Sequence, residues 1–265
     1  MKIRACCAMI ALFFALSFTG CDAFFSTSLG SPRKYDASKI DVNAGNIADW
    51  LKASVGNSDL ASAVTEAILR ELGKVTDPAE KAALLQGGVS LAVESSGLGE
   101  SILTRGSELL QNLDNIDDTV VTDLLKNIQN DFISSGGVQA AENIAQMVNK
   151  SITTDANGIP VFDKTYADLA QPGDVAEAIL VLVMGELGSK SITDQNTWSD
   201  LTTLTNGLDI IKDSDPPQVK VTDSSSVSPT SLALAAYINL IAGNPDKFMG
   251  NPLASTINDA FFSKS

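Results

Sequence analysis

The chain has 265 residues, no histidine, three cysteines and a formal net charge of −14 at neutral pH. The lack of histidine excludes Ser-His-Asp triads, imidazole zinc sites and the side chain that most often acts as general base near neutral pH. The negative charge disfavours nucleic acid phosphates and anionic headgroups as partners, so we expect no nucleic acid binding. Two explanations of this charge stay open. It keeps the surface soluble, or it attracts a cationic partner or a divalent metal ion.

The first 20 residues have the layout of a secretory signal peptide. Lys2 and Arg4 form a short basic start, and an uncharged apolar stretch follows from Ala5 to Phe18. Small residues then precede Cys21, as at a cleavage site. The apolar stretch is shorter than the roughly 20 residues that a comfortable membrane-spanning helix needs. We therefore predict that residues 1–20 are removed.

The sequence Phe18-Thr19-Gly20-Cys21 resembles the lipobox of bacterial lipoprotein precursors, in which a small residue precedes an invariant cysteine. Phe18 stands where leucine is usual, and this departure resembles the looser lipoboxes of spirochaetes. The resemblance implies that the Cys21 thiol receives a diacylglycerol, that the chain is cleaved before Cys21, and that the new amine is often acylated. It places the protein in the bacterial cell envelope, extracytoplasmic and anchored by lipid. An ordinary secreted protein with a free Cys21 is the alternative.

The other two cysteines, Cys6 and Cys7, lie inside the removed segment. If Cys21 is lipidated, the mature chain has no thiol nucleophile, thiolate metal site or disulfide, so its hydrophobic core alone must stabilise it. Removal of Lys2 and Arg4 leaves 16 basic and 32 acidic residues, a net charge of −16. Membrane attachment should therefore come from acyl chains and not from a basic patch.

Three segments follow from the composition along the chain. Residues 1–20 are the signal peptide, residues 21–38 are a lipidated N-terminus with a Ser-rich tether, and residues 39–265 are one helical domain. Phe24 and Phe25 in the tether could lie at the membrane interface or dock on the folded body.

From residue 39 onward, apolar residues recur at spacings of three and four, the pattern of amphipathic helices. We predict a single, all-α globular domain of about eight to ten helices. Asp77-Pro78 reads as an N-cap with proline in the first turn, and Ser228-Pro229 starts another helix. Gly97 and Gly99 should break the helix that begins at Pro78. The predicted stripes run over residues 60–75, 82–93, 102–113, 120–133, 138–148, 178–184 and 232–241, with short helices after Pro245 and Pro252.

Glycines and prolines divide these helices. Gly136-Gly137 separates the stripes at 120–133 and 138–148, which predicts an antiparallel helical hairpin between them. Residues 152–172 carry turn chemistry and a short extended run, so a small hairpin or ordered loop is expected there. Residues 213–229 are polar and contain proline and serine, which predicts a surface loop. The run at 178–184 is the most apolar of the mature chain and predicts a central core helix.

Two tripeptides raise the alternative of two related helical halves. Glu71-Leu72-Gly73 is echoed by Glu186-Leu187-Gly188, a little over a hundred residues later. Thr76-Asp77 follows the first tripeptide and Thr193-Asp194 the second, each opening a new helix. Five matched positions leave this alternative open.

Several residues are candidates for a site, each with a structural explanation beside it. Asp155, Asn157 and Asp163 resemble part of a calcium loop, but Tyr166 stands where an EF-hand needs its bidentate glutamate, so an Asx turn is favoured. Gly87, Gly88 and Gly185 fit close helix packing better than ligand contact. Core packing is favoured over a pocket for the large aromatics Trp50, Trp198 and Tyr237. Helix capping is favoured over metal binding for the acidic cluster of Asp114, Asp117, Asp118 and Asp123.

These observations predict a non-enzymatic envelope lipoprotein that binds a protein partner or small ligand through helical surfaces, with Cys21 as its lipidation site. No catalytic residue, cofactor or metal ligand is assigned. An accessory component of a solute-uptake system is one alternative, by analogy with helical lipoproteins of spirochaetes. A hydrolase that uses an Asp/Glu pair is another, because carboxylate chemistry survives the missing residue types.

Overall fold

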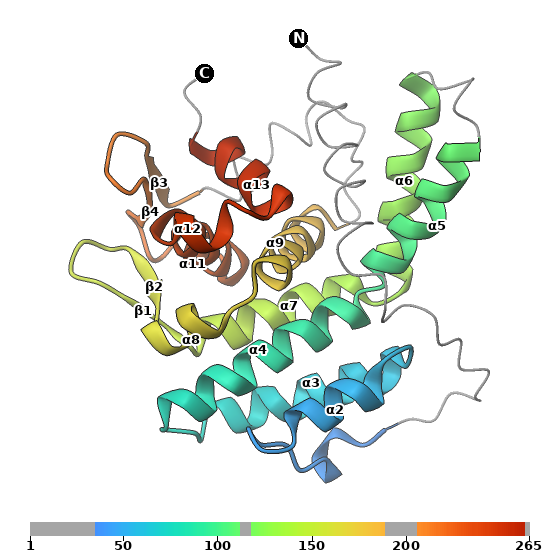
Figure 1. The fold of residues 1–265 in the computed structure, drawn as a ribbon, viewed down its shortest axis with the longest axis horizontal. Coiled ribbons are helices and arrows are strands. Elements are labelled where there is room, and N and C mark those ends of the chain that lie inside the picture. Colours follow the sequence, from blue (N-terminus) through green and yellow to red (C-terminus); the bar gives the residue numbers. More distant parts are fainter. Residues whose placement is uncertain (1–34, 112–117, 189–205, 263–265) are drawn as a thin grey trace.

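The computed structural model describes residues 35–111, 118–188 and 206–262. Within them the chain forms a single all-α domain, as predicted, with two small two-stranded sheets (Figure 1). A 3-10 turn, η1 (Ala37–Lys39), comes first. The helices are α2 (Ile47–Ser54), α3 (Ser58–Leu72), α4 (Pro78–Ser95), α5 (Leu98–Gln111), α6 (Asp118–Ser134), α7 (Gly137–Asn149), α8 (Lys164–Leu169), α9 (Pro172–Leu187), α11 (Pro229–Gly243), α12 (Pro245–Phe248) and α13 (Pro252–Phe262). The strands are β1 (Ile152–Thr154), β2 (Pro160–Phe162), β3 (Leu208–Ile211) and β4 (Gln218–Val221). The described residues thus hold eleven α-helices, above the eight to ten expected, because α8 and α12 are very short.

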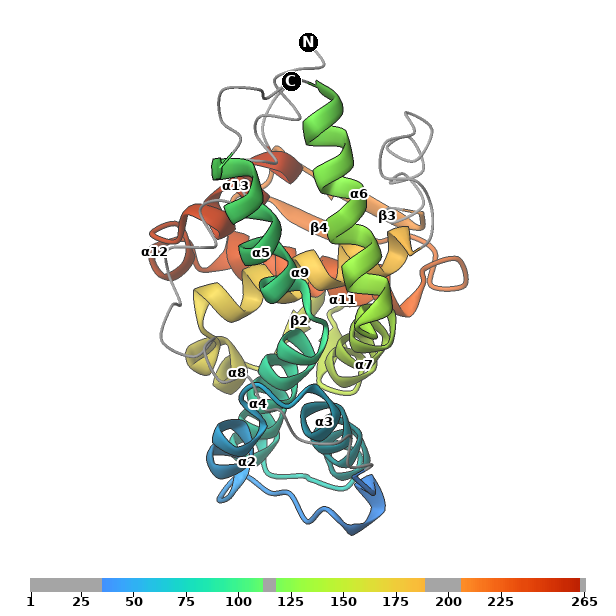
Figure 2. The same ribbon diagram turned by 90° about the vertical axis from the view of Figure 1, so that its right-hand side faces the viewer.

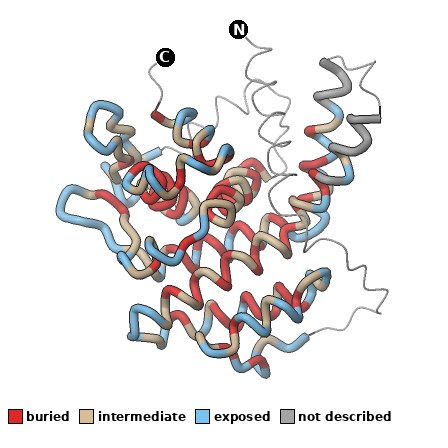
Figure 3. The backbone as a smooth tube through the Cα atoms, viewed as in Figure 1, coloured by how far each residue is buried: buried red, intermediate tan, exposed pale blue. Residues whose placement is uncertain are grey.

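The helices pack in layers around α4 and α7 (Figure 1). Helices α2 and α3 lie against α4 on one side, and α9 and α11 lie against α7 on the other. Helix α13 closes over α9 and α11. The buried residues gather where these layers meet (Figure 3). Helix α9 contains the predicted apolar run and lies at the centre of the fold, with Val181 and Leu182 fully buried.

Glycines inside helices mark the closest helix contacts, as predicted. A Cβ on Gly185 of α9 would lie 2.2 Å from the Cβ of Ala141 on α7. A Cβ on Gly88 of α4 would lie 2.5 Å from the sulfur of Met147, also on α7. Neither position has room for a side chain. The three central helices therefore approach one another because two of them carry glycine at the crossings.

The predicted helix starts are confirmed at both proline positions. The Asp77 carboxylate accepts a hydrogen bond from the backbone N–H of Glu80, and Pro78 is the first residue of α4. The Ser228 hydroxyl accepts from the N–H of Ser231 in the same way at the start of α11. The prediction for Gly99 was wrong. Ser96 and Gly97 separate α4 from α5, and Gly99 lies in the first turn of α5.

The predicted hairpin between the stripes at 120–133 and 138–148 was also wrong. Helix α6 runs beside α5, whereas α7 turns away across the body (Figures 1 and 2). Gly136 adopts φ +87°, and Gly137 lets the ring of Phe132 pack directly on the start of α7. The two glycines therefore allow a sharp change of direction between α6 and α7, so that α6 pairs with α5 instead.

The two irregular segments contain paired strands. Strands β1 and β2 form the small antiparallel hairpin predicted within residues 152–172. The prediction for residues 213–229 needs correction, because Gln218–Val221 is a strand paired with β3, and Val219 is buried. Asn239 of α11 joins the two hairpins. Its side-chain N–H groups donate to the carbonyls of Pro160 (3.1 Å) and Val219 (2.9 Å), and its carbonyl accepts from the N–H of Val219 (2.7 Å).

The described chain begins just before η1, which Arg70 of α3 holds in place. The Arg70 guanidinium donates to the carbonyls of Ala37 (2.9 Å) and Ile40 (2.8 Å). Cys21, Phe24, Phe25 and the signal segment lie outside the described residues. No helix among the described residues is both long and apolar enough to span a bilayer.

Candidate functional site

Two acidic side chains project from the first turns of α9, a strongly apolar helix. Asp174 and Glu177 are three residues apart in α9, a spacing that places both on one face of a helix. Both are partly buried, while Val175, Ala176 and Ala178 around them are fully buried. The sequence of α9 contains no lysine or arginine. Two carboxylates therefore share one face of a core helix that supplies no basic residue.

Asp174 faces α4, where it meets a hydroxyl group. The Ser90 hydroxyl donates to Oδ2 of Asp174 over 3.0 Å. Burial raises the pKa of Asp174 above its ordinary value, and the hydrogen bond from Ser90 opposes this rise. A hydrogen bond from a serine hydroxyl stabilises a buried carboxylate less than one from a guanidinium or ammonium group would. Asp174 is thus under-compensated for its burial.

The pKa of Glu177 is raised as well. Burial, and then the negative charge of Asp174, raise the pKa of Glu177 to about 7. No hydrogen bond or ion pair to Glu177 is found among the described residues. Near neutral pH this carboxyl exchanges its proton readily. The pair can therefore accept a cation, accept hydrogen bonds from a donor, or bind a proton.

Two tyrosines lie behind Asp174 in the core. The hydroxyls of Tyr166 (α8) and Tyr237 (α11) are 3.4 Å apart, and both side chains are buried. The ring of Phe162 packs on both, with centroid separations of 4.5 Å and 5.1 Å. Burial raises the pKa of each tyrosine, and the charge of Asp174 raises both further. These tyrosines stay protonated and form a polar spot within an apolar core.

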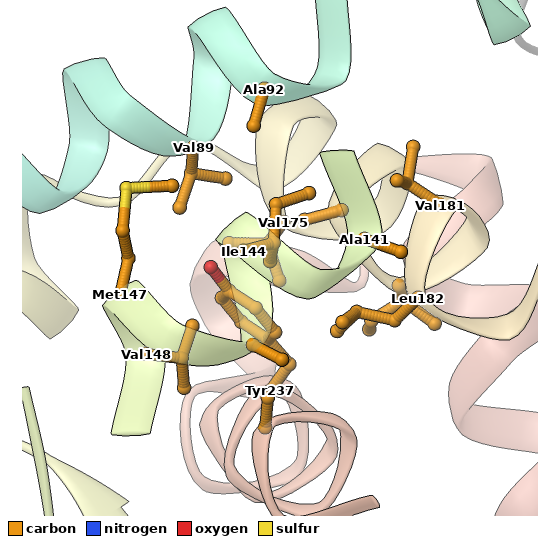
Figure 4. Close-up of a cluster of buried hydrophobic side chains, with 14 of the residues drawn as sticks. Val89, Ala92, Ala141, Ile144, Met147, Val148, Val175, Val181, Leu182 and Tyr237 are labelled. Carbon is orange, nitrogen blue, oxygen red and sulfur yellow. The ribbon is translucent and has the colours of Figure 1, made fainter. Parts of the chain in front are cut away.

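The surrounding core fixes the position of α9 (Figure 4). Tyr237 rises from α11 toward Ile144 of α7, among side chains from α4 and α9. The first turns of α9 are therefore held by tight packing on their buried side, and Asp174 and Glu177 occupy the less buried side.

The residues singled out from the sequence lie elsewhere. Asp155 forms the predicted Asx turn, because its carboxylate accepts from the N–H groups of Asn157 (2.8 Å) and Ile159 (2.9 Å), which lowers its pKa. Tyr237 is a core residue, as predicted. Trp50 is partly buried and its indole N–H donates to the carbonyl of Asp41. Trp198 lies outside the described residues.

Two members of the predicted acidic cluster, Asp118 and Asp123, lie among the described residues. Asp118 is the first residue of α6, and Asp123 forms a 3.7 Å ion pair with Lys126 on the surface. Asp114 and Asp117 lie outside the described residues. Among the described residues, no group of three or more Asp, Glu, Cys or His side chains is arranged to hold a metal ion.

Asp174 and Glu177, which precede the apolar run at 178–184, were not singled out from the sequence. The available signal was their position, because Glu177 directly follows two residues that the helical pattern places in the core. A carboxylate inside such a stripe has to be desolvated when the helix packs.

Comparison with known proteins adds no relative. No family model, no curated protein and no solved structure matches this chain.

Proposed function

We propose that this chain is a bacterial envelope lipoprotein, anchored at Cys21, that binds a protein partner or small ligand through its helical body without catalysis. The basic and apolar start of the chain and the sequence Phe18-Thr19-Gly20-Cys21 support the anchor. A diacylglycerol brings two acyl chains, and each buried methylene adds about 0.8 kcal/mol to membrane affinity. Two chains suffice to hold an acidic body that an anionic membrane surface would repel.

The observation that carries the binding proposal is the pair of Asp174 and Glu177. Partly buried carboxylates without a basic partner raise the free energy of the folded protein. A ligand that brings a positive charge or several hydrogen-bond donors would relieve this cost on binding. Carboxyl groups with strongly perturbed pKa values are common at binding sites, where a partner supplies the missing stabilisation.

The geometry of the pair favours binding over hydrolysis. Glycoside hydrolases place their two carboxyl groups on opposite sides of the bond that breaks. Asp174 and Glu177 are on one face of one helix, so a substrate would meet both from the same side. This pair therefore gives no support to the hydrolase alternative. An accessory role in solute uptake is a special case of the binding proposal, in which the ligand is a transported solute.

Co-purification from native membranes tests the binding proposal. The wild-type protein is isolated beside the double variant Asp174→Asn/Glu177→Gln, and retained proteins and small molecules are identified by mass spectrometry. The matched control is Glu186→Gln, which changes a carboxylate near the other end of α9. We expect a partner or ligand that the wild type and the control retain and the double variant loses. An identical retained set in all three would overturn the proposal.

The anchor is tested separately with Cys21→Ser. We expect this variant to lose incorporation of labelled fatty acid and to appear in the soluble fraction or as uncleaved precursor. A variant that still carries labelled fatty acid and fractionates as mature protein would show that Cys21 is not the anchor.

A further inference from the structure

Helices α5 and α6 leave and rejoin the body at two adjoining junctions. The chain passes from α4 to α5 through Gly97, which has φ +67°, and from α6 to α7 through Gly136, which has φ +87°. A Cβ on Gly97 would lie 2.6 Å from the hydroxyl oxygen of Ser135, so the two junctions touch. A Cβ on Gly136 would meet nothing within 4 Å. Both connections thus meet at one place, which we call the joint.

Helices α5 and α6 are tied to each other on the far side of the joint. The carboxylate of Asp131 on α6 accepts from Ser101 (3.0 Å) and from Nε of Arg105 (2.9 Å), both on α5. Nη2 of Arg105 reaches the other oxygen of Asp131 over 3.2 Å. Both helices carry buried apolar side chains along their length: Leu98, Ile102, Leu125, Ile128 and Phe132. The two helices, which we call the arm, therefore hold together as a unit.

The far ends of α5 and α6 lie apart from α9 and α13 (Figure 1). The ring of Phe132 rests on Gly137, where a Cβ would lie 2.4 Å from the ring. Among the described residues, the arm also contacts the end of α9, where the side-chain N–H of Gln129 donates to the carbonyl of Gly188 over 2.8 Å. Gly188 caps the C-terminus of α9, and Asp174 and Glu177 lie near the other end of that helix.

We propose that the arm turns as a unit on the joint of Gly97 and Gly136, and that the hydrogen bond from Gln129 to Gly188 holds one orientation and links it to α9. This inference goes beyond the proposed function. Glycines permit a change of backbone angle that other residues resist, and Gly137 carries no side chain where the ring of Phe132 packs on it. A rigid pair of helices on such a joint moves as one body.

Spin labels at Asp123→Cys on the arm and Glu66→Cys on α3 test this inference by pulsed electron resonance. A chain that begins at residue 22 has no other cysteine and keeps the whole described core, which lies between Ile40 and Phe262. Asp123 lies about 20 Å along α6 from the joint, so a rotation of about 15° displaces it by about 5 Å. We expect Gln129→Ala to shift or broaden the distance distribution by about this amount. The control Gln171→Ala removes a glutamine bonded to the carbonyl of Leu169, away from the arm, and should leave the distribution unchanged.

Amide hydrogen exchange separates turning from unfolding. In Gln129→Ala we expect faster exchange at Gly97 and Gly136 and unchanged exchange inside α5 and α6. An unchanged distance distribution in Gln129→Ala would overturn the inference. Faster exchange throughout α5 and α6 would also overturn it, because the arm would then melt and not turn.

Discussion

The base of the arm and the interface between α4 and α9 each hold a partly buried aspartate, and the two are treated in opposite ways. Asp131 accepts from Arg105 and Ser101, and the arginine holds its pKa below the usual value. Among the described residues, Asp174 accepts a side-chain hydrogen bond from Ser90 and has Glu177 beside it, and burial raises the pKa of both carboxyls. Burial and partner together decide whether a carboxylate stabilises this fold, because Asp174 is both more deeply buried than Asp131 and without an arginine beside it. The net charge of the chain does not indicate which of its aspartates has a basic partner.

The sequence explains why α9 lacks a compensating cation. Lys81 is the basic residue of α4, and it precedes Ser90 by nine residues, which is about 13 Å along the helix. The arm instead places Arg105 directly across from Asp131 on the neighbouring helix. One region thus contains a satisfied ion pair, and the other contains a carboxylate pair open to a partner.

The largest expected effect concerns the attachment of the arm. Phe132→Ala removes a fully buried ring at the base of α6 and should lower the free energy of unfolding by about 3–5 kcal/mol. Chemical denaturation measures this loss. Ile133→Ala, at the next and largely exposed position, should change stability by less than about 1 kcal/mol. Equal effects of both variants would mean that Phe132 does not anchor the arm.

The next effect separates the α4–α9 interface from the arm by its pH dependence. The folded pKa of Glu177, about 7, lies above its ordinary value of 4.5, so the folded protein binds the proton more tightly than the unfolded chain. The unfolding free energy should therefore fall as pH rises from 4.5 to 7 and then level off. Glu177→Gln should remove most of this fall, leaving the part due to Asp174, and be more stable than wild type by about 2 kcal/mol at pH 8.

Urea unfolding between pH 4 and pH 8 measures this difference. Glu186→Gln on the same helix is the matched control and should retain the wild-type pH dependence. A Glu177→Gln variant with the wild-type slope would show that Glu177 does not titrate in this range.

The layered helical body could be predicted from the sequence, because local residue patterns mark where its helices begin and which face is apolar. Asp77-Pro78 and Ser228-Pro229 carry their own capping chemistry, and the apolar stripes follow the helical period. The partner of α6 could not be predicted in this way. Gly136-Gly137 permits either a tight hairpin or a turn onto a new axis, and the packing of Phe132 on Gly137 decides between them.

The opposite sign of pH dependence is expected at the base of the arm. The pKa of Asp131 is lowered in the fold, so its contribution to stability is present above pH 3.8 and is lost as pH falls through the folded pKa. Arg105→Ala should cost about 1 kcal/mol at neutral pH, because about a third of each side chain is exposed, and should cost less in acid. Lys126→Ala, whose pair with Asp123 is more exposed, should have a smaller effect at any pH. Unfolding curves at pH 7 and pH 3 provide the measurement.

The smallest effect concerns Ser90. Ser90→Ala removes the hydroxyl that donates to Asp174, so the pKa of Asp174 should rise further and stability at neutral pH should fall by about 1 kcal/mol. Carboxyl carbon NMR titration follows Asp174 directly. Ser62→Ala, at a partly buried position on α3, should leave that titration unchanged. An unaltered Asp174 titration in Ser90→Ala would show that the hydrogen bond does not persist.

The carboxylate pair itself was hidden from sequence reasoning for a related reason. The spacing of Asp174 and Glu177 places them on one face of a helix, but only the packing of α4 against α9 determines how far that face is buried. The local sequence pattern predicts helix α9. The electrostatic environment of Asp174 depends on residues more than eighty positions away, such as Ser90.

The side chain of Asn239, which joins both hairpins to α11, has a consequence for how the chain is made. An isolated two-stranded hairpin is marginally stable in water, and β1 and β2 leave the ribosome long before Asn239 does. We expect α3, α4 and α7 to assemble early through contacts between near neighbours in sequence, and both hairpins to remain unsupported until α11 is synthesised. A nascent chain that ends before Pro229 should thus be cut by protease within residues 152–162, and a chain extended past α13 should resist the cut. The two hairpins are therefore fixed only when α11 (Pro229–Gly243) has docked.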